Sequence, residues 1–173
     1  MVKHKEENNA AYIIKRINEI RGERPGKKVL QKMVFLMIEK GVPLNYDFGL
    51  HFYGPYSSPL NTETDFLYAD GIIKIDYSGN SHKMEVDESV EVSSCGLTDE
   101  QKNNIDDVIE KFKDMSPSNL ELLTTAIYAY NLLEDKSEES IINGVVKIKG
   151  TKYSTDDIRR SFKYFSFFNK SFC

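Results

Sequence analysis

The chain has 173 residues, of which 40% are hydrophobic and 29% charged, and its formal net charge is −4. This composition is typical of a globular protein and excludes disordered and collagen-like chains, and no apolar run approaches the roughly 20 residues of a membrane span. Cys95 and Cys173 form no disulfide framework and no metal-ligand spacing, and the polar N-terminus lacks the apolar core of a signal peptide, so we expect a cytoplasmic protein.

Two helices are predicted at the start of the chain. Apolar residues recur at helical spacing over residues 10–20 and again over residues 30–37. A glycine and then a proline follow each stretch, which is the usual signal for the end of a helix. The second predicted helix has an apolar stripe flanked by lysines and a glutamine, so we expect one face in the core and one in solvent.

A short strand is predicted next. Phe48, Leu50 and Phe52 alternate with a glycine and a histidine, which is the period of a half-buried strand. We expect the dipeptide Gly54-Pro55 to end it.

A third helix and a hairpin follow. Residues 58–70 predict a short helix, with these apolar side chains directed inward: Leu60, Phe66 and Leu67. Residues 72–77 and 84–92 predict two strands joined by a turn at residues 78–81, the second strand with a bulge at Asp87-Glu88.

The remainder of the chain predicts helices only. Their expected ranges are 98–112, 116–133, 137–146 and 154–168. The stretch from Leu120 to Leu133 is apolar nearly all round, so we expect it to be the central buried helix. The C-terminal aromatic residues exceed what one helix face buries, so we expect some of them to contact another part of the core or a second subunit of a homo-oligomer: Phe162, Tyr164, Phe165, Phe167, Phe168 and Phe172.

Together these elements predict a mostly helical α+β fold. We expect residues 1–96 to form a winged-helix-like unit, with three helices and a small antiparallel sheet. Residues 97–173 would form a helical part that shares one core with it.

The sequence shows no pattern typical of a catalytic, metal or cofactor site. No two of its histidines are three or four residues apart, which is the spacing of two metal ligands on one helix face. The sequence also contains no CxxC, HExxH or GxSxG motif. The stretch from Gly22 to Lys28 has too short a spacing for a P-loop, lacks the Ser or Thr after the lysine and follows a helix. We therefore expect that the protein is not an enzyme and binds no cofactor or metal. We expect Gly22 to Lys28 to form a turn between two helices, with the basic residues at the start of the second helix exposed to solvent.

Charge is distributed unevenly along the chain. Residues 1–40 hold 10 Lys/Arg against 5 Asp/Glu, residues 41–144 hold 6 against 20, and residues 145–173 hold 7 against 2. In a winged-helix protein, the helix before the hairpin inserts in the major groove of DNA. The corresponding predicted helix of this chain, residues 58–70, has acidic residues and no Lys or Arg, and the hairpin after it is also acidic. The negative charge of this helix and hairpin disfavours DNA binding. The basic residues at the two ends of the chain leave DNA binding through another face as an alternative.

Two motifs carry a family resemblance. One is the helix Lys28-Val-Leu-Gln-Lys-Met-Val-Phe-Leu36, and the other is Phe52-Tyr-Gly-Pro-Tyr-Ser57. They resemble the YwgA-like proteins and, more distantly, the SocA-like Panacea domain of antitoxins. The likeness to the first family extends through two more stretches and covers about residues 8–168: Leu120–Tyr128 and Lys147–Ile158. Panacea domains bind a partner protein without catalysis or cofactor, so the resemblance implies a binding module.

We therefore predict a non-enzymatic, protein-binding regulatory module, antitoxin-like or adapter-like, with a winged-helix DNA-binding transcriptional regulator as the alternative. The candidate partner-binding residues lie in the two motifs: Lys27, Lys28, Gln31, Lys32, Tyr53, Gly54, Pro55, Tyr56 and Ser57. The alternative interpretation of the same residues is structural, as the packing hinge of the fold.

Overall fold

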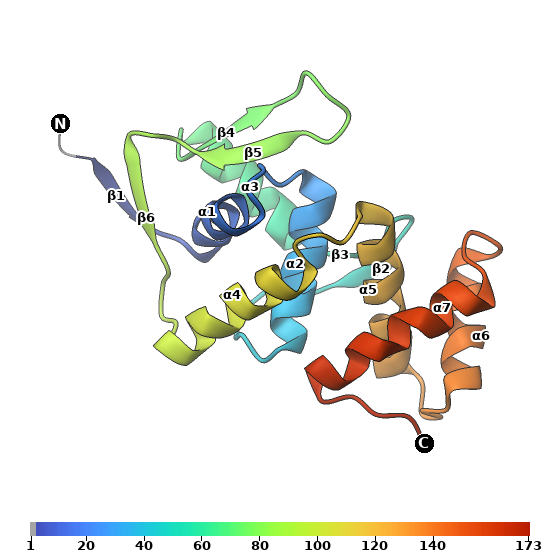
Figure 1. Ribbon diagram of the computed structural model, residues 1–173. Coiled ribbons are helices and arrows are strands. Elements are labelled where there is room, and N and C mark those ends of the chain that lie inside the picture. Colours follow the sequence, from blue (N-terminus) through green and yellow to red (C-terminus); the bar gives the residue numbers. More distant parts are fainter. Residues whose placement is uncertain (1–2) are drawn as a thin grey trace.

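The computed structural model describes residues 3–173 (Figure 1). Its helices are α1 (Asn9–Arg21), α2 (Lys27–Glu39), α3 (Ser58–Ala69), α4 (Asp99–Phe112), α5 (Pro117–Leu132), α6 (Glu138–Lys149) and α7 (Thr155–Ser161), with the 3₁₀ helix η1 (Phe162–Phe168) continuing from α7. Its strands are β1 (His4–Glu7), β2 (Gly49–His51), β3 (Gly54–Tyr56), β4 (Ile73–Asp76), β5 (Lys83–Val86) and β6 (Val90–Ser93). The mostly helical α+β class is confirmed. None of the helices in the described range is long and apolar enough to cross a membrane.

The predicted helices are present because their ends carry strong local signals. Thr98 and Gln101 form the capping box that starts α4, and Ser116 caps α5 ahead of a proline at its first position. Gly22, in the left-handed conformation, ends α1.

Two helices form the centre of the molecule. In α2 every residue from Val29 to Met37 is buried, so the predicted division into a core face and a solvent face is wrong. The central position predicted for α5 is confirmed, since its residues from Leu120 to Ile127 are buried. Figure 1 shows α2 and α5 side by side, and they pack against each other directly. One buried apolar cluster includes residues from both sides of the expected boundary at residue 96.

The strands pair differently from the prediction. The hairpin of β4 and β5 is present, but the expected single return strand is two strands, and β6 leaves the hairpin to pair in parallel with β1. β2 pairs with β3 rather than joining β4 and β5. The winged-helix arrangement is therefore not confirmed, because its shared sheet is replaced by separate strand pairs.

The C-terminal aromatic residues pack within the chain. The rings of Tyr164 and Phe168 lie 5.4 and 5.9 Å from the ring of Phe112 in α4, and Phe165 lies 5.6 Å from Tyr130 in α5. They therefore contact another part of the core, which was one of the two predicted outcomes. None of the six is an exposed large hydrophobic residue, so covering them requires no second subunit.

Candidate functional site

The β2–β3 hairpin presents two aromatic residues at its tip. His51 pairs with Gly54, so Phe52 and Tyr53 form the turn between them. Gly54, directly after this turn, has a φ of +87°, in the left-handed region that favours glycine. The side chain of Phe52 is 85% exposed and that of Tyr53 is 46% exposed.

The strand prediction was wrong about this hairpin. Leu50 and Phe52 were expected to face the core, but both are exposed, and only Phe48 is partly buried, against Phe35. Gly54 and Pro55 do not end the sheet structure; they begin β3. The alternation of apolar residues gave no sign of this, because it does not show that β3 packs against α5 whereas all three residues of β2 are exposed.

A cavity of about 290 Å³ lies beside the hairpin. Its lining comes from the first turns of α2, from the hairpin and from the start of α3: Lys27, Lys28, Gln31, Lys32, His51, Phe52, Tyr53, Gly54, Tyr56 and Asn61. The structure thus brings together most of the residues predicted from the two motifs. Pro55 and Ser57 lie outside the lining, while His51, Phe52 and Asn61 were missed. We call this hairpin and cavity the aromatic corner.

Two buried polar side chains of α2 hold the hairpin and α3 in place. The Gln31 amide donates to the carbonyl oxygen of Ser57 at 2.9 Å and accepts from its N–H at 2.8 Å. The Lys32 ammonium donates to the carbonyl oxygen of Pro55 at 2.7 Å. Both side chains are more than nine-tenths buried, so they act structurally at the floor of the cavity rather than as exposed contacts for a partner.

A second buried lysine holds the hairpin from the other side. Lys149, from the end of α6, donates to the carbonyl oxygen of Phe52 at 2.8 Å and to the Glu121 carboxylate at 2.6 Å. Lys152 donates to the same carboxylate oxygen at 2.8 Å. The aromatic tip is therefore fixed by lysines at both ends, with Glu121 of α5 between α6 and the hairpin. Glu121, Lys149 and Lys152 lie in the two further family-like stretches of the sequence, whose pattern predicts no role for them.

Burial and ion pairing set the protonation of this cluster. Burial lowers the pKa of Lys32 to about 8, against the opposing attraction of Glu121. Burial alone would raise the pKa of Glu121, but hydrogen bonds from Lys149 and Lys152 outweigh it and hold that pKa below its ordinary value. Glu121 therefore stays ionised at neutral pH, and Lys32 is largely charged.

The rim of the aromatic corner is cationic. Lys27 pairs with Asp65 at 3.2 Å, and the Lys28 ammonium lies 3.4 Å from the centre of the Tyr53 ring. The aromatic corner and its supports contain five lysines, which face only two carboxylates: Lys27, Lys28, Lys32, Lys149 and Lys152 against Asp65 and Glu121. The excess of positive charge next to exposed aromatic rings suits the binding of a group that is apolar and also carries negative charge.

Among residues 3–173 no three His, Cys, Asp or Glu side chains gather as possible metal ligands. The ring of His51 lies 4.7 Å from that of Tyr56. Both cysteines are exposed and lie outside the cavity lining.

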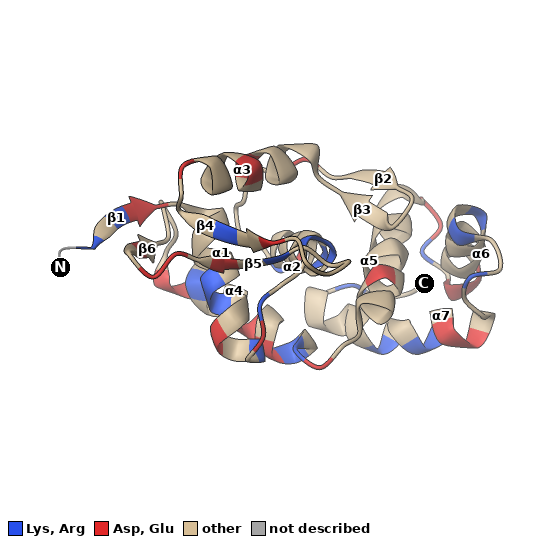
Figure 2. Ribbon diagram, turned by 90° about the horizontal axis from the view of Figure 1, so that it is seen from above, with Lys and Arg blue, Asp and Glu red and all other residues tan. Residues whose placement is uncertain are grey.

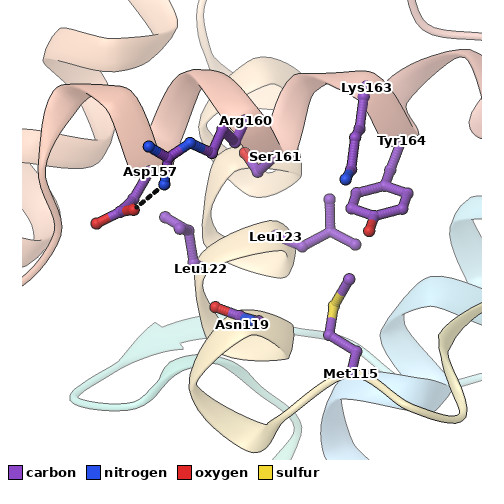
Figure 3. A pocket seen from close by; sticks show the side chains of 9 residues that line it. All are labelled: Met115, Asn119, Leu122, Leu123, Asp157, Arg160, Ser161, Lys163 and Tyr164. Carbon is purple, nitrogen blue, oxygen red and sulfur yellow. Dashed lines mark hydrogen bonds and ion pairs between the residues drawn. The ribbon is translucent and has the colours of Figure 1, made fainter.

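A separate cavity of about 250 Å³ lies between α5 and the helices α7 and η1 (Figure 3). Its apolar floor includes Leu122 and Leu123, and its rim carries Arg160, which donates to Asp157 at 3.1 Å. No residue of either sequence motif lines it. We therefore assign the candidate site to the aromatic corner.

Comparison with known proteins shows a similarity that covers most of the chain. No family model matches the chain. Over 146 residues, which cover 83% of this chain and 86% of the relative, the chain is 25% identical to the uncharacterized protein YwgA of Bacillus subtilis (strain 168). The resemblance to YwgA-like proteins that the motifs indicated is therefore confirmed. The more distant resemblance to Panacea domains is not shown.

Proposed function

We propose that this YwgA-like chain is a non-enzymatic, antitoxin-like or adapter-like module that binds a partner protein through the aromatic corner. The observation that carries the proposal is the exposure of Phe52 on a turn whose two ends are held by buried lysines. Exposed aromatic residues dominate the binding energy of many protein interfaces. A turn that is already rigid loses little conformational entropy on binding, which favours affinity.

The charge of the aromatic corner supports a partner with an acidic contact surface. Among residues 3–173 no ion pair joins Lys28 to a carboxylate, and the Lys149 and Lys152 ammonium groups share the carboxylate of Glu121. A carboxylate beside an apolar side chain on the partner would complement both features.

The DNA-binding alternative finds no support in the described residues. Figure 2 shows α3 with acidic and no basic positions, and Lys27 of α2 is already paired with Asp65 on that helix. The basic residues of α7 lie at the end of the molecule away from α3 and from the β4–β5 hairpin (Figures 1 and 2). Arg159 and Arg160 are each paired with an acidic residue of α7.

Affinity capture with two matched variants tests the proposal. Phe52→Ser removes the exposed ring of the aromatic corner, and Phe66→Ser removes a ring that is 66% exposed on α3, the helix that a winged-helix protein inserts in DNA. Each tagged protein is expressed in the native cell, and the captured proteins are quantified, with duplex DNA selection from a random library run in parallel.

We expect a partner that the wild type and Phe66→Ser capture equally and that Phe52→Ser loses by at least tenfold. Capture that survives Phe52→Ser but not Phe66→Ser would place the interface on α3 and overturn the proposal. Enrichment of a defined DNA sequence at about 150 mM salt, where non-specific binding is weak, would favour the transcriptional regulator instead.

A further inference from the structure

The cavity of the aromatic corner adjoins a second, larger cavity at the start of α2. The second cavity has a volume of about 620 Å³ and is lined by the α1–α2 connection, the β4–β5 turn and Pro117. Lys27 and Lys28 line both cavities, so the two meet along the first turn of α2. We call the two cavities together the α2 groove. It extends from the tip of the β2–β3 hairpin to the turn between β4 and β5, with the start of α2 between them (Figure 1).

Both hairpins at the ends of the α2 groove are fixed to the rest of the molecule. Two buried lysines hold the β2–β3 hairpin through its carbonyl oxygens. Two backbone hydrogen bonds hold the β4–β5 hairpin against the α1–α2 connection and the start of α2. The Lys27 N–H donates to the Ser81 carbonyl oxygen at 3.2 Å, and the Met84 N–H donates to the Pro25 carbonyl oxygen at 2.9 Å. The walls of the groove are therefore in place before a partner binds, which reduces the entropy lost on binding.

The lining of the α2 groove is both basic and apolar. Phe52 and Tyr53 line one end, and Pro25 and Pro117 line the other. Among the residues that the structure describes, Glu23 is the one acidic residue of the lining, against six Lys and Arg: Arg21, Arg24, Lys27, Lys28, Lys32 and Lys83. A ligand that complements this lining combines apolar groups with negative charge.

Neighbouring carboxylates compensate only part of the positive charge. Arg24 and Lys27 are paired with carboxylates of the β4–β5 hairpin and of α3. Lys83 lies 3.8 Å from the carboxylate of Glu23, which it shares with an arginine of the lining. Among residues 3–173 no ion pair joins Lys28 to a carboxylate. Each end of the groove thus has a lysine that can pair with an added carboxylate, Lys28 beside the aromatic tip and Lys83 at the β4–β5 turn.

We propose that the α2 groove binds an acidic segment of the partner protein that also carries apolar side chains. This inference rests on the proposed function, because it names the part of the partner that contacts the aromatic corner. An apolar side chain of the segment packs against Phe52 and Tyr53, and carboxylates pair with Lys28 and Lys83. A single side chain at the aromatic corner would leave the second cavity empty, since that cavity alone has the size of a small-molecule pocket. A segment of chain can occupy both.

A single-stranded nucleic acid also combines negative charge with groups that stack on aromatic rings. It suits the α2 groove less well, because every nucleotide carries a phosphate and the groove offers few free cations. Arg24 and Lys27 already have carboxylate partners. A peptide can carry its few carboxylates where Lys28 and Lys83 lie.

Selection of peptides by the purified full chain tests the inference. A random library of peptides of about 12 residues, which span roughly 40 Å when extended, is displayed on phage and selected at about 150 mM salt. Binding of the enriched peptides is then measured by calorimetry, and amide shifts of ¹⁵N-labelled protein locate them. A single-stranded oligothymidylate is titrated in parallel.

The variants change one end of the α2 groove at a time. Lys83→Glu reverses the charge at the β4–β5 turn, and Phe52→Ser removes the ring at the aromatic corner. The control is Lys147→Glu, which makes the same change of charge on α6, outside both cavities. Because the Lys83 side chain is 40% exposed, we expect its substitution to leave the fold intact. Lys83→Gln, which adds no negative charge, is the second variant in case Lys83→Glu does not fold.

We expect the enriched peptides to carry net negative charge and at least one apolar residue. They should shift amides at both ends of the groove, at Phe52 and Tyr53 and at residues 81–83. Lys83→Glu and Phe52→Ser should each weaken binding at least tenfold, Lys83→Gln at least threefold, and Lys147→Glu less than twofold.

Three results would overturn the inference. Binding that depends on Phe52 but not on Lys83 would confine the contact to the aromatic corner, and the proposed function would stand without the groove. Binding that does not depend on Phe52 would count against the groove and against the proposed function. Enrichment of neutral or basic peptides, enrichment of none, or tighter binding of oligothymidylate than of any peptide would exclude an acidic segment as the ligand.

Discussion

The hydroxyl oxygen of Thr125 in α5 lies 2.8 Å from the point that a Cβ atom on Gly54 would occupy. This close approach seats the β2–β3 hairpin against the central helix and adds to the left-handed φ of Gly54 as a reason for glycine.

Gly54→Ala should therefore destabilise the fold more than a substitution that introduces backbone strain alone. The matched control is Gly71→Ala, where φ is +73° and a Cβ would meet nothing within 4 Å. We expect Gly54→Ala to lower the free energy of unfolding by about 1–2 kcal/mol more than Gly71→Ala, measured by urea denaturation. Equal losses would show that the contact with Thr125 is not tight.

Thr125→Val should stabilise the protein. The Thr125 hydroxyl is buried and has no hydrogen-bond partner in the described structure, and valine has nearly the same shape without the polar group. We expect a gain of about 1 kcal/mol in the free energy of unfolding. The partnered neighbour Thr124, whose hydroxyl donates to the Leu120 carbonyl oxygen at 2.8 Å, provides the control. Thr124→Val should bring no such gain, and a loss at both positions would contradict the prediction.

Lys32 should make the protein more stable as the pH rises from neutral. Its pKa is about 8 in the folded state, below the 10.5 of a free lysine. Between these values the unfolded chain binds more protons than the folded one, so the free energy of unfolding increases with pH. Relative to Lys32→Met, the wild type should gain about 2 kcal/mol between pH 7.5 and 9.5. Comparison with the variant cancels the titration of the other lysines and tyrosines. A difference that does not change with pH would mean that Lys32 is not desolvated.

Glu121→Gln should destabilise the fold far more than loss of an exposed ion pair. It leaves the Lys149 ammonium, 5% exposed, without a carboxylate, and removing one member of a buried pair costs about 3–5 kcal/mol. The control is Glu110→Gln at the exposed pair with Lys113, where we expect a change below about 0.5 kcal/mol. Urea denaturation of both variants checks the prediction, and similar small losses would show that the buried pair is not important for stability.

The sequence predicted the helices well because their ends are encoded locally. The capping box of Thr98 and Gln101 and the cap at Ser116 depend on residues that are close in sequence. The strand β1 was missed, since His4–Glu7 has no apolar alternation and its pairing with β6 depends on residues far along the chain.

The two sequence motifs indicated where the aromatic corner lies, but they did not show which of its residues are buried supports and which are exposed. Gln31 and Lys32 looked like a polar surface, yet each lies among apolar neighbours that are themselves buried. A polar residue inside such a stretch is a signal for an internal hydrogen bond, but only the fold shows that the acceptors are Pro55 and Ser57. Phe52 was assigned to a core because period-2 alternation alone does not show whether a sheet has anything packed against it.

The parallel pairing of β1 with β6 constrains the order of events during synthesis. β1 has no partner until the ribosome has released the chain through Ser93, although α1, α2 and α3 can already form. During that interval β1 has an unpaired backbone edge, and its polar residues Lys5 and Glu6 protect it from pairing with other chains. The same lack of apolar residues that left β1 without a signal in the sequence also makes its unpaired edge less prone to pair with other chains.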